Sequence, residues 1–164
     1  MTSSREDVTG ITIDPALHDL LERPLLARLA TVDDDGYPAV VPVWFEWADG
    51  AFWIVARARA AYLANLSHRP LVGLSIVDDR DPDRRLHVRG RATLATPGAP
   101  LAGGVLDLAR RLAERYEGAG GLEYVERSRA WPRVLVRIDP DRIVGWASPD
   151  WHPRYRDEPY EEDG

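Results

Sequence analysis

Two Asp-Gly pairs, Asp35-Gly36 and Asp49-Gly50, interrupt a run of apolar and aromatic residues in the first third of the chain. Such pairs favour the tight turns of β-hairpins, because glycine readily adopts the positive φ that these turns need. The segments beside them are rich in Val, Leu and Trp, which is typical of strands. They comprise residues 25–32, 39–47 and 51–57. We therefore expect three consecutive strands in an antiparallel meander.

The rest of the chain continues this pattern. In the segment 85–95, Leu86 and Val88 alternate with His87 and Arg89, which predicts a strand with one buried face. Other strands are expected at residues 71–77, 133–138 and 142–147, the last two as one strand or a pair. Short helices are expected at 15–23, 60–68 and 101–112, with a loop at 117–124. Six or so antiparallel strands and few helices predict a mainly β fold, a small barrel or closed sheet.

Length and composition fit one compact domain. The chain has 164 residues, 45% of them hydrophobic and 29% charged, so we expect it to bury a substantial core. We expect a flexible lead-in at residues 1–13, a single domain at 14–155 and an acidic solvated tail at 156–164. The polar N-terminus and the lack of a long apolar run predict a cytoplasmic protein with no membrane partner. The net charge of −6 argues against nucleic-acid binding.

The side chains that are missing limit the chemistry. All 21 basic residues are arginines and cysteine is absent, so lysine Schiff bases, thiolate nucleophiles and disulfides are excluded. The four histidines share no metal-ligand spacing, and no metal site is expected. An anion site therefore has to use arginine, backbone N–H groups or hydroxyls.

Arg57 and Arg59 stand between the strand 51–57 and the short helix 60–68. Two guanidinium groups at such a junction suit a phosphate, because N–H groups at a helix start and nearby cations both favour an anion. The other interpretation is that both side chains are simply solvated. The residues alone leave the two interpretations open.

The order of these segments resembles one known family. A helix, the run ARLATVDDDGYPAVVPVWFEWADGAFWIVAR, the segment YLANLSHRPLVGLSI and the strand LHVRGRATL are similar to the pyridoxamine-phosphate-oxidase-like proteins. The late PDRIVGWASPDWHPRY resembles the C-terminal strand and tail of actinobacterial members. The resemblance covers about residues 15–155. It implies an antiparallel six-stranded split β-barrel, in a homodimer that binds flavin or the deazaflavin coenzyme F-420 between its subunits.

The resemblance also implies where the cofactor phosphate is held, at the end of the third strand and the start of the next helix. The matching residues are Arg57, Arg59, Ala60, Ala61, Tyr62 and Asn65. Many members carry a lysine where this chain has Tyr62. A tyrosine hydroxyl offers a hydrogen bond but no charge, and charge-assisted hydrogen bonds are about twice as strong as neutral ones. Arg57 or Arg59 is therefore expected to compensate.

The cofactor ring is implied to lie against two strands, with a late aromatic cluster as a further candidate wall. The strand residues are Pro42, Val43, Trp44, Ile54, Val55 and Ala56, and the late residues are Trp146, Trp151 and His152. Core and edge packing is the alternative interpretation of the late cluster. No side chain is required as an acid or base; Tyr62, His152 and Tyr155 are candidates if one lies over the ring.

The implied function is an oxidoreductase that binds F-420 or FMN and transfers hydride to or from an unknown small organic substrate. The arginine-only basic set and the actinobacterial features favour F-420 slightly over FMN. Two alternatives from another class stay open. One is a dimer that sequesters flavin or haem without turnover, and the other is a barrel that has lost its cofactor and serves as an interaction domain.

Overall fold

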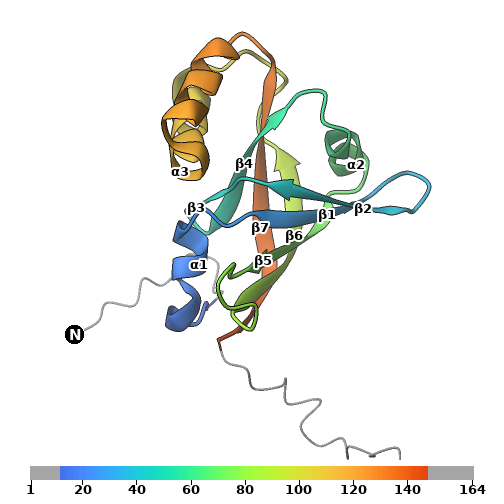
Figure 1. Ribbon diagram of the computed structural model, residues 1–164. Helices are drawn as coiled ribbons and strands as arrows, with labels where there is room; N and C mark the ends of the chain where they lie inside the picture. The colour runs from blue at the N-terminus through green and yellow to red at the C-terminus, as the bar shows by residue number, and fades with distance from the viewer. Residues whose placement is uncertain (1–11, 148–164) are drawn as a thin grey trace, which may run out of the picture.

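The computed structural model describes residues 12–147, in which one curled antiparallel sheet is flanked by helices (Figure 1). The strands are β1 (Ala27–Val32), β2 (Pro38–Val43), β3 (Glu46–Ala48), β4 (Ala51–Arg57), β5 (Leu71–Val77), β6 (Arg85–Leu94) and β7 (Arg133–Trp146). The helices are a 3-10 turn η1 (Pro15–Leu17), α1 (Asp19–Glu22), α2 (Tyr62–His68) and α3 (Gly103–Arg127). The predicted mainly β fold is confirmed. None of these helices is both long and apolar enough to cross a membrane.

The strand order explains why the sheet curls. In the seven-stranded sheet the order is β2-β1-β5-β6-β7-β4-β3, so β2 and β3 lie at opposite edges. Only Trp44 and Phe45 separate these two strands along the chain. Three Cα–Cα steps span about 11 Å at most, so the two edges must approach each other. The sheet is therefore a half-barrel, as a split barrel requires.

Both antiparallel pairings of the predicted meander form, but its second strand is divided between the two edges of the sheet. The segment 39–47 is not one strand, because β2 pairs with β1 whereas β3 pairs with β4. The chain bends between them at Trp44 and Phe45. Phe45 is fully buried, and its ring centroid lies 5.6 Å from that of Phe52. The bend thus turns an aromatic ring into the core, and the division raises the strand number from six to seven.

The last strand is longer than expected. Residues 133–138 and 142–147 fall almost entirely within the single strand β7, which pairs with β6 through a register shift at Arg89/Gly90. A Cβ added to Gly90 would lie 2.5 Å from the carbonyl oxygen of Asp139. Only glycine therefore allows the two strands to pass this closely at the shift.

The predicted loop at 117–124 is wrong as well, because α3 continues to Arg127. Gly118 has φ 60° and ψ −140°, so α3 consists of two helical segments with a break between them. Residues with a Cβ rarely adopt that conformation. Val125 packs in one cluster with Ala109 of the first segment, and this packing holds the glycine-rich second segment in helical form.

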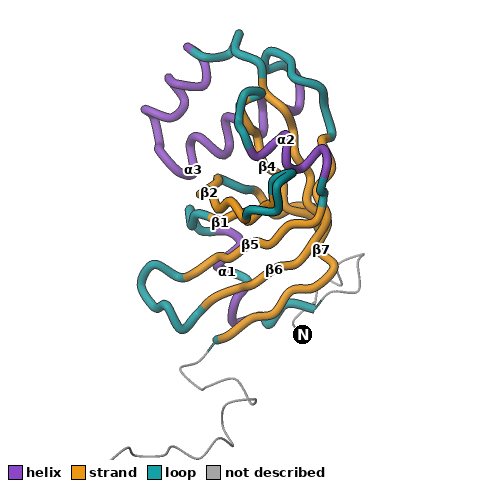
Figure 2. The backbone as a smooth tube through the Cα atoms, turned by 90° about the vertical axis from the view of Figure 1, so that its right-hand side faces the viewer, coloured by secondary structure: helices purple, strands orange, loops and turns teal. Residues whose placement is uncertain are grey.

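Two apolar clusters hold the elements together. The larger fills the inside of the half-barrel and includes Leu29, Phe45, Phe52, Ile76, Leu86 and Val136. The smaller contains Leu101, Leu106, Ala109, Ala113 and Val125, with Trp44 and Val55 packed against it. Figure 2 shows α3 and α2 at the same end of the molecule, near β4. The smaller cluster therefore fixes α3 beside β4.

A buried carboxylate fastens the opposite end. The Asp78 side chain is 2% exposed and pairs with Arg23 at 2.9 Å and with Arg84 at 2.6 Å. Asp19 of α1 also pairs with Arg84, at 2.5 Å. The hydrogen bond from Arg23 holds the pKa of Asp78 well below its usual range. This network ties α1 to the β5–β6 connection.

Candidate functional site

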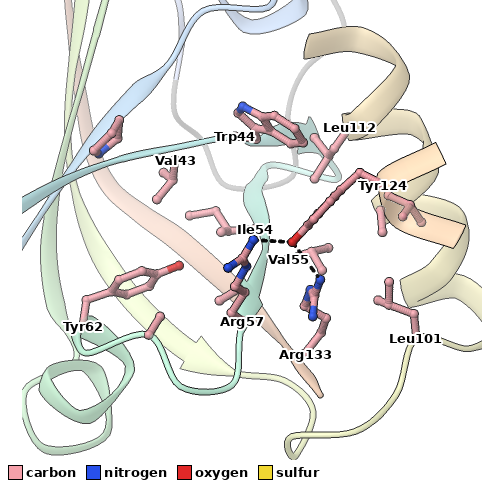
Figure 3. Close-up of a pocket in the computed structure, with 15 residues that line it drawn as sticks. Val43, Trp44, Ile54, Val55, Arg57, Tyr62, Leu101, Leu112, Tyr124 and Arg133 are labelled. Atoms are coloured by element: carbon pink, nitrogen blue, oxygen red, sulfur yellow. Dashed lines mark hydrogen bonds between the residues drawn. The ribbon is translucent and has the colours of Figure 1, made fainter. Parts of the chain in front are cut away.

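A pocket of about 320 Å³ lies between β2, β4, the start of α2 and α3 (Figure 3). Most of the sequence-predicted residues line it: Pro42, Val43, Trp44, Ile54, Val55, Ala56, Arg57, Ala60 and Tyr62. Most of these side chains are apolar, and the volume falls in the range of small-molecule sites. Among the described lining residues, the charged ones are Arg57 and Arg133.

The other predicted residues lie elsewhere. Arg59 lines a second cavity of about 520 Å³ and not the first. Ala61 is exposed at the N-cap of α2. The Asn65 amide donates to the Thr31 hydroxyl at 3.0 Å, which ties α2 to β1 instead of facing the pocket. These residues shape the surroundings of the pocket rather than its walls.

Trp146, the member of the late aromatic cluster that lies within the described residues, is also away from the pocket. The Trp146 ring lies 4.9 Å from the His87 ring and 4.7 Å from the Arg85 guanidinium, and Trp146 lines neither cavity. Trp151 and His152 lie outside the described residues. Their suggested contact with a cofactor stays a prediction.

Sequence reasoning missed the wall that α3 contributes. The additional lining residues are Leu101, Ala109, Leu112, Tyr124, Val125 and Arg133. Leu101 and Leu112 fall within the helix expected at 101–112, and apolar side chains at helical spacing have to pack against another element. Tyr124 was assigned to a loop, and Arg133 carried no signal beyond its place at a strand start.

Arg57 and Arg133 meet at the charged end of the pocket. They are directly opposite in the β4–β7 pair, and both donate to the Tyr124 hydroxyl, from Arg133 at 3.4 Å. The guanidinium of Arg57 also lies 5.5 Å from the centroid of the Tyr124 ring and 5.9 Å from that of Trp131. Arg133 is only 6% exposed, and its burial lowers its pKa. Both guanidiniums line the second cavity too, so they stand between the two spaces.

Tyr62 reaches into the pocket from the opposite side. Figure 3 shows its hydroxyl directed toward the space beside Arg57. Within residues 12–147 this hydroxyl has no hydrogen-bond partner, and burial raises the pKa of Tyr62 to about 12. It is therefore a neutral donor that is available to a ligand. α2 has seven residues, so its dipole adds little and positive charge has to come from arginine.

Contacts between α3 and the β2–β3 bend hold the wall of the pocket that contains Trp44. The Trp44 and Tyr116 rings are stacked, with centroids 5.1 Å apart and an angle of 9°. The Tyr116 hydroxyl donates to the Leu25 carbonyl oxygen at 2.9 Å, and Arg111 pairs with Glu46 at 2.7 Å. These contacts fix the first segment of α3, so the apolar part of the pocket is preformed.

Residues 13–147 match the family model for pyridoxamine 5'-phosphate oxidase. The chain belongs to this family. No curated protein gives a significant match to the sequence. The family membership confirms the resemblance drawn from the order of the sequence segments.

Solved structures show the same fold. An F-420 reductase is 28% identical, with a TM-score of 0.62, and the match covers 80% of this chain and 98% of that one. HutZ, a haem storage protein of Vibrio cholerae, is 16% identical over 83% of this chain and 96% of its own, with a TM-score of 0.61. An FAD-binding protein of Mesorhizobium loti is 17% identical over 81% and 92%, with a TM-score of 0.53. The last two establish only a shared fold.

Proposed function

We propose that the chain is an oxidoreductase that binds F-420 or FMN in the pocket between β2, β4 and α3. The observation that carries this proposal is the combination of apolar walls with Arg57 and Arg133 at one end, where no carboxylate within residues 12–147 pairs with either. A flat heteroaromatic ring with an attached phosphate matches that combination. The family membership and the likeness to an F-420 reductase support the same ligand class.

Each part of the pocket has a task in this proposal. The cofactor, when bound, supplies hydride transfer to or from a small organic substrate. Trp44, Val55 and Leu112 give the ring an apolar surface and keep water from it. Arg57 holds the phosphate, and the free Tyr62 hydroxyl donates a further hydrogen bond to it. No described side chain is assigned as an acid or base.

We further propose that a second copy of the chain covers the open side. Val40 and Leu71 are 62% and 60% exposed, which is unusual for such large apolar side chains. Val40 lies two residues from Pro42 of the pocket, and it pairs with Ala30, which pairs with Gly73. The exposed apolar face is thus continuous with the pocket. Light scattering should show a dimer, and Val40→Asp should give monomers with weaker cofactor binding; a wild-type monomer would contradict the dimer.

A haem-sequestering protein is the competing function. Haem iron needs an axial ligand such as His, Met, Cys or Tyr. The described lining contains no His, Met or Cys. Tyr62 is the accessible tyrosine, but its pKa of about 12 disfavours the phenolate that iron prefers. The described pocket therefore supports a flavin-type ligand better than haem.

Native mass spectrometry of the purified protein tests this choice. The protein is mixed with equal amounts of FMN, F-420 and haem, and the bound mass is measured. We expect one flavin-type cofactor per subunit, with F-420 ahead of FMN, and loss of that mass in Arg57→Gln. Exclusive binding of haem, or no binding of any of the three, would overturn the proposal.

A further inference from the structure

Arg57 and Arg133 place two positive charges opposite each other in the sheet. Like charges directly opposite in an antiparallel pair destabilise it. The usual remedy is a carboxylate between the two cations, as Asp78 provides between Arg23 and Arg84. No carboxylate within residues 12–147 pairs with Arg57 or Arg133, so no described residue neutralises their charge.

The described partners of the pair are all neutral. Arg133 donates to the Ser128 hydroxyl at 3.0 Å and to the Trp131 carbonyl oxygen at 3.2 Å, and both guanidiniums donate to Tyr124. Arg133 is 6% exposed. Burying a cation with only neutral acceptors is costly unless an anion completes the site. Arg133 is therefore placed and oriented for a negative group.

We propose that Arg133 binds the cofactor phosphate together with Arg57, and that the Tyr124 hydroxyl occupies the phosphate position until an oxyanion displaces it. This inference rests on the proposed function, because both proposals assign the cofactor phosphate to Arg57. An ionised oxygen makes hydrogen bonds with guanidinium about twice as strong as a phenol oxygen does. The exchange is therefore favourable, and it frees on each guanidinium the N–H group that Tyr124 accepts from.

The position of the pair agrees with this assignment. Both guanidiniums line the main pocket and the second cavity, so a phosphate can reach them from the space that holds the ring. Tyr124 belongs to the second segment of α3, which is also held by an Arg110–Glu126 pair at 2.6 Å. The segment therefore stays attached when the hydroxyl of Tyr124 is displaced.

The test compares each cofactor with the same ring compound without phosphate. FMN is paired with riboflavin, and F-420 with the deazaflavin alcohol that lacks the phosphodiester. The quantity of interest is the ratio of the two affinities, measured by fluorescence titration for the full chain. For FMN and riboflavin, which differ only by the phosphate, this ratio isolates the phosphate contribution from ring stacking and from general loss of folding; for F-420 it reports the phosphodiester together with the tail attached to it.

We expect Arg133→Gln to lower the ratio at least tenfold, with unchanged affinity for the phosphate-free compound. Tyr124→Phe should raise the ratio severalfold, because it removes the competing acceptor and keeps the ring. Arg80→Gln, in the exposed connection between β5 and β6, is the matched control and should leave the ratio unchanged. If Arg133→Gln does not fold, the ratio for Tyr124→Phe decides alone.

The outcomes separate the two proposals. If the phosphorylated compounds bind the wild type but Tyr124→Phe does not raise the ratio, the role of Tyr124 and Arg133 is overturned while the proposed function stands. If none of the four compounds binds the wild type, the proposed function fails and this inference fails with it.

Discussion

Tyr62 and Tyr124 reach into the same pocket from opposite sides, but their hydroxyls are in opposite states (Figure 3). The Tyr124 hydroxyl accepts from Arg57 and Arg133, whereas that of Tyr62 has no partner within residues 12–147. Figure 3 shows the Arg57 guanidinium between the two hydroxyls. The proposed phosphate site thus lies between two hydroxyl groups. The Tyr62 hydroxyl is free to donate to a ligand, and the Tyr124 hydroxyl already accepts from the arginines.

Tyr62→Lys should tighten the binding of FMN or F-420. The ammonium places a cation at the start of α2, and a charged donor forms a stronger hydrogen bond to phosphate than a phenol does. The gain should stay below about tenfold because the ammonium must also be desolvated. Calorimetric titration of wild type, Tyr62→Lys and Tyr62→Phe gives the comparison. Weaker binding by a correctly folded Tyr62→Lys would show that phosphate does not lie beside this residue.

Arg57→Ala should weaken cofactor binding more than Arg59→Ala does. Arg57 lines the main pocket, whereas Arg59 lines only the second cavity. Losing a charged hydrogen bond to phosphate costs about 1.5–3 kcal/mol, so a loss of that size is expected for Arg57. The same calorimetric titration measures both variants, with Arg80→Ala as the control. Equal effects of Arg57 and Arg59 would place the phosphate at the α2 junction instead.

Gly118→Ala should destabilise the protein, whereas Gly120→Ala should stabilise it. Gly118 has a positive φ of 60°, which costs a residue with a Cβ about 1–3 kcal/mol. Gly120 lies in the second helical segment with open space around it, where alanine gains about 0.5–1 kcal/mol. Urea unfolding of the two variants measures the difference. Stabilisation by both substitutions would mean that α3 is one continuous helix.

Asp78 should control stability in acid. Its pKa is held low mainly by the hydrogen bond from Arg23, so its ionised form stabilises the folded state above the unfolded pKa of about 4. That contribution is lost as pH falls below this value. Asp78→Asn should cost about 3 kcal/mol at pH 7 and show a weaker loss of stability on acidification.

The control for this prediction is Asp83→Asn. Asp83 is 53% exposed and 3.9 Å from Arg85, so its removal should change stability by less than about 0.5 kcal/mol. Chemical unfolding between pH 7 and pH 3 measures both variants. Parallel pH curves for wild type and Asp78→Asn would contradict the stabilising role of the buried carboxylate.

Strands with clear ends in the sequence were predicted well. The segments 51–57 and 71–77 are strands with those bounds, because Asp49-Gly50 precedes the first and Pro70 precedes the second. The division of the segment 39–47 into β2 and β3 was not predictable in the same way. The bend at Trp44 and Phe45 contains no glycine or proline, and what causes it is the burial of Phe45, a tertiary effect.

In the candidate site, too, the walls on clearly bounded strands were predicted and the wall that depends on tertiary packing was not. The β2 and β4 walls followed from the family resemblance, since they lie on well-defined strands. The α3 wall did not, because Gly118 and the glycines after it indicate a loop until packing of Val125 is known. Arg133 was missed because the sequence does not reveal that this arginine is buried without a carboxylate.

A crystal structure of the protein with bound F-420 or FMN tests the proposed site most directly. We expect the ring against β2 and β4, beside Trp44 and Val55, and the phosphate within hydrogen-bonding distance of Arg57. Arg133 should contact the same phosphate, with the Tyr124 hydroxyl displaced from both guanidiniums. A cofactor bound elsewhere, or a pocket that stays empty at saturating cofactor, would contradict the assignment of this pocket.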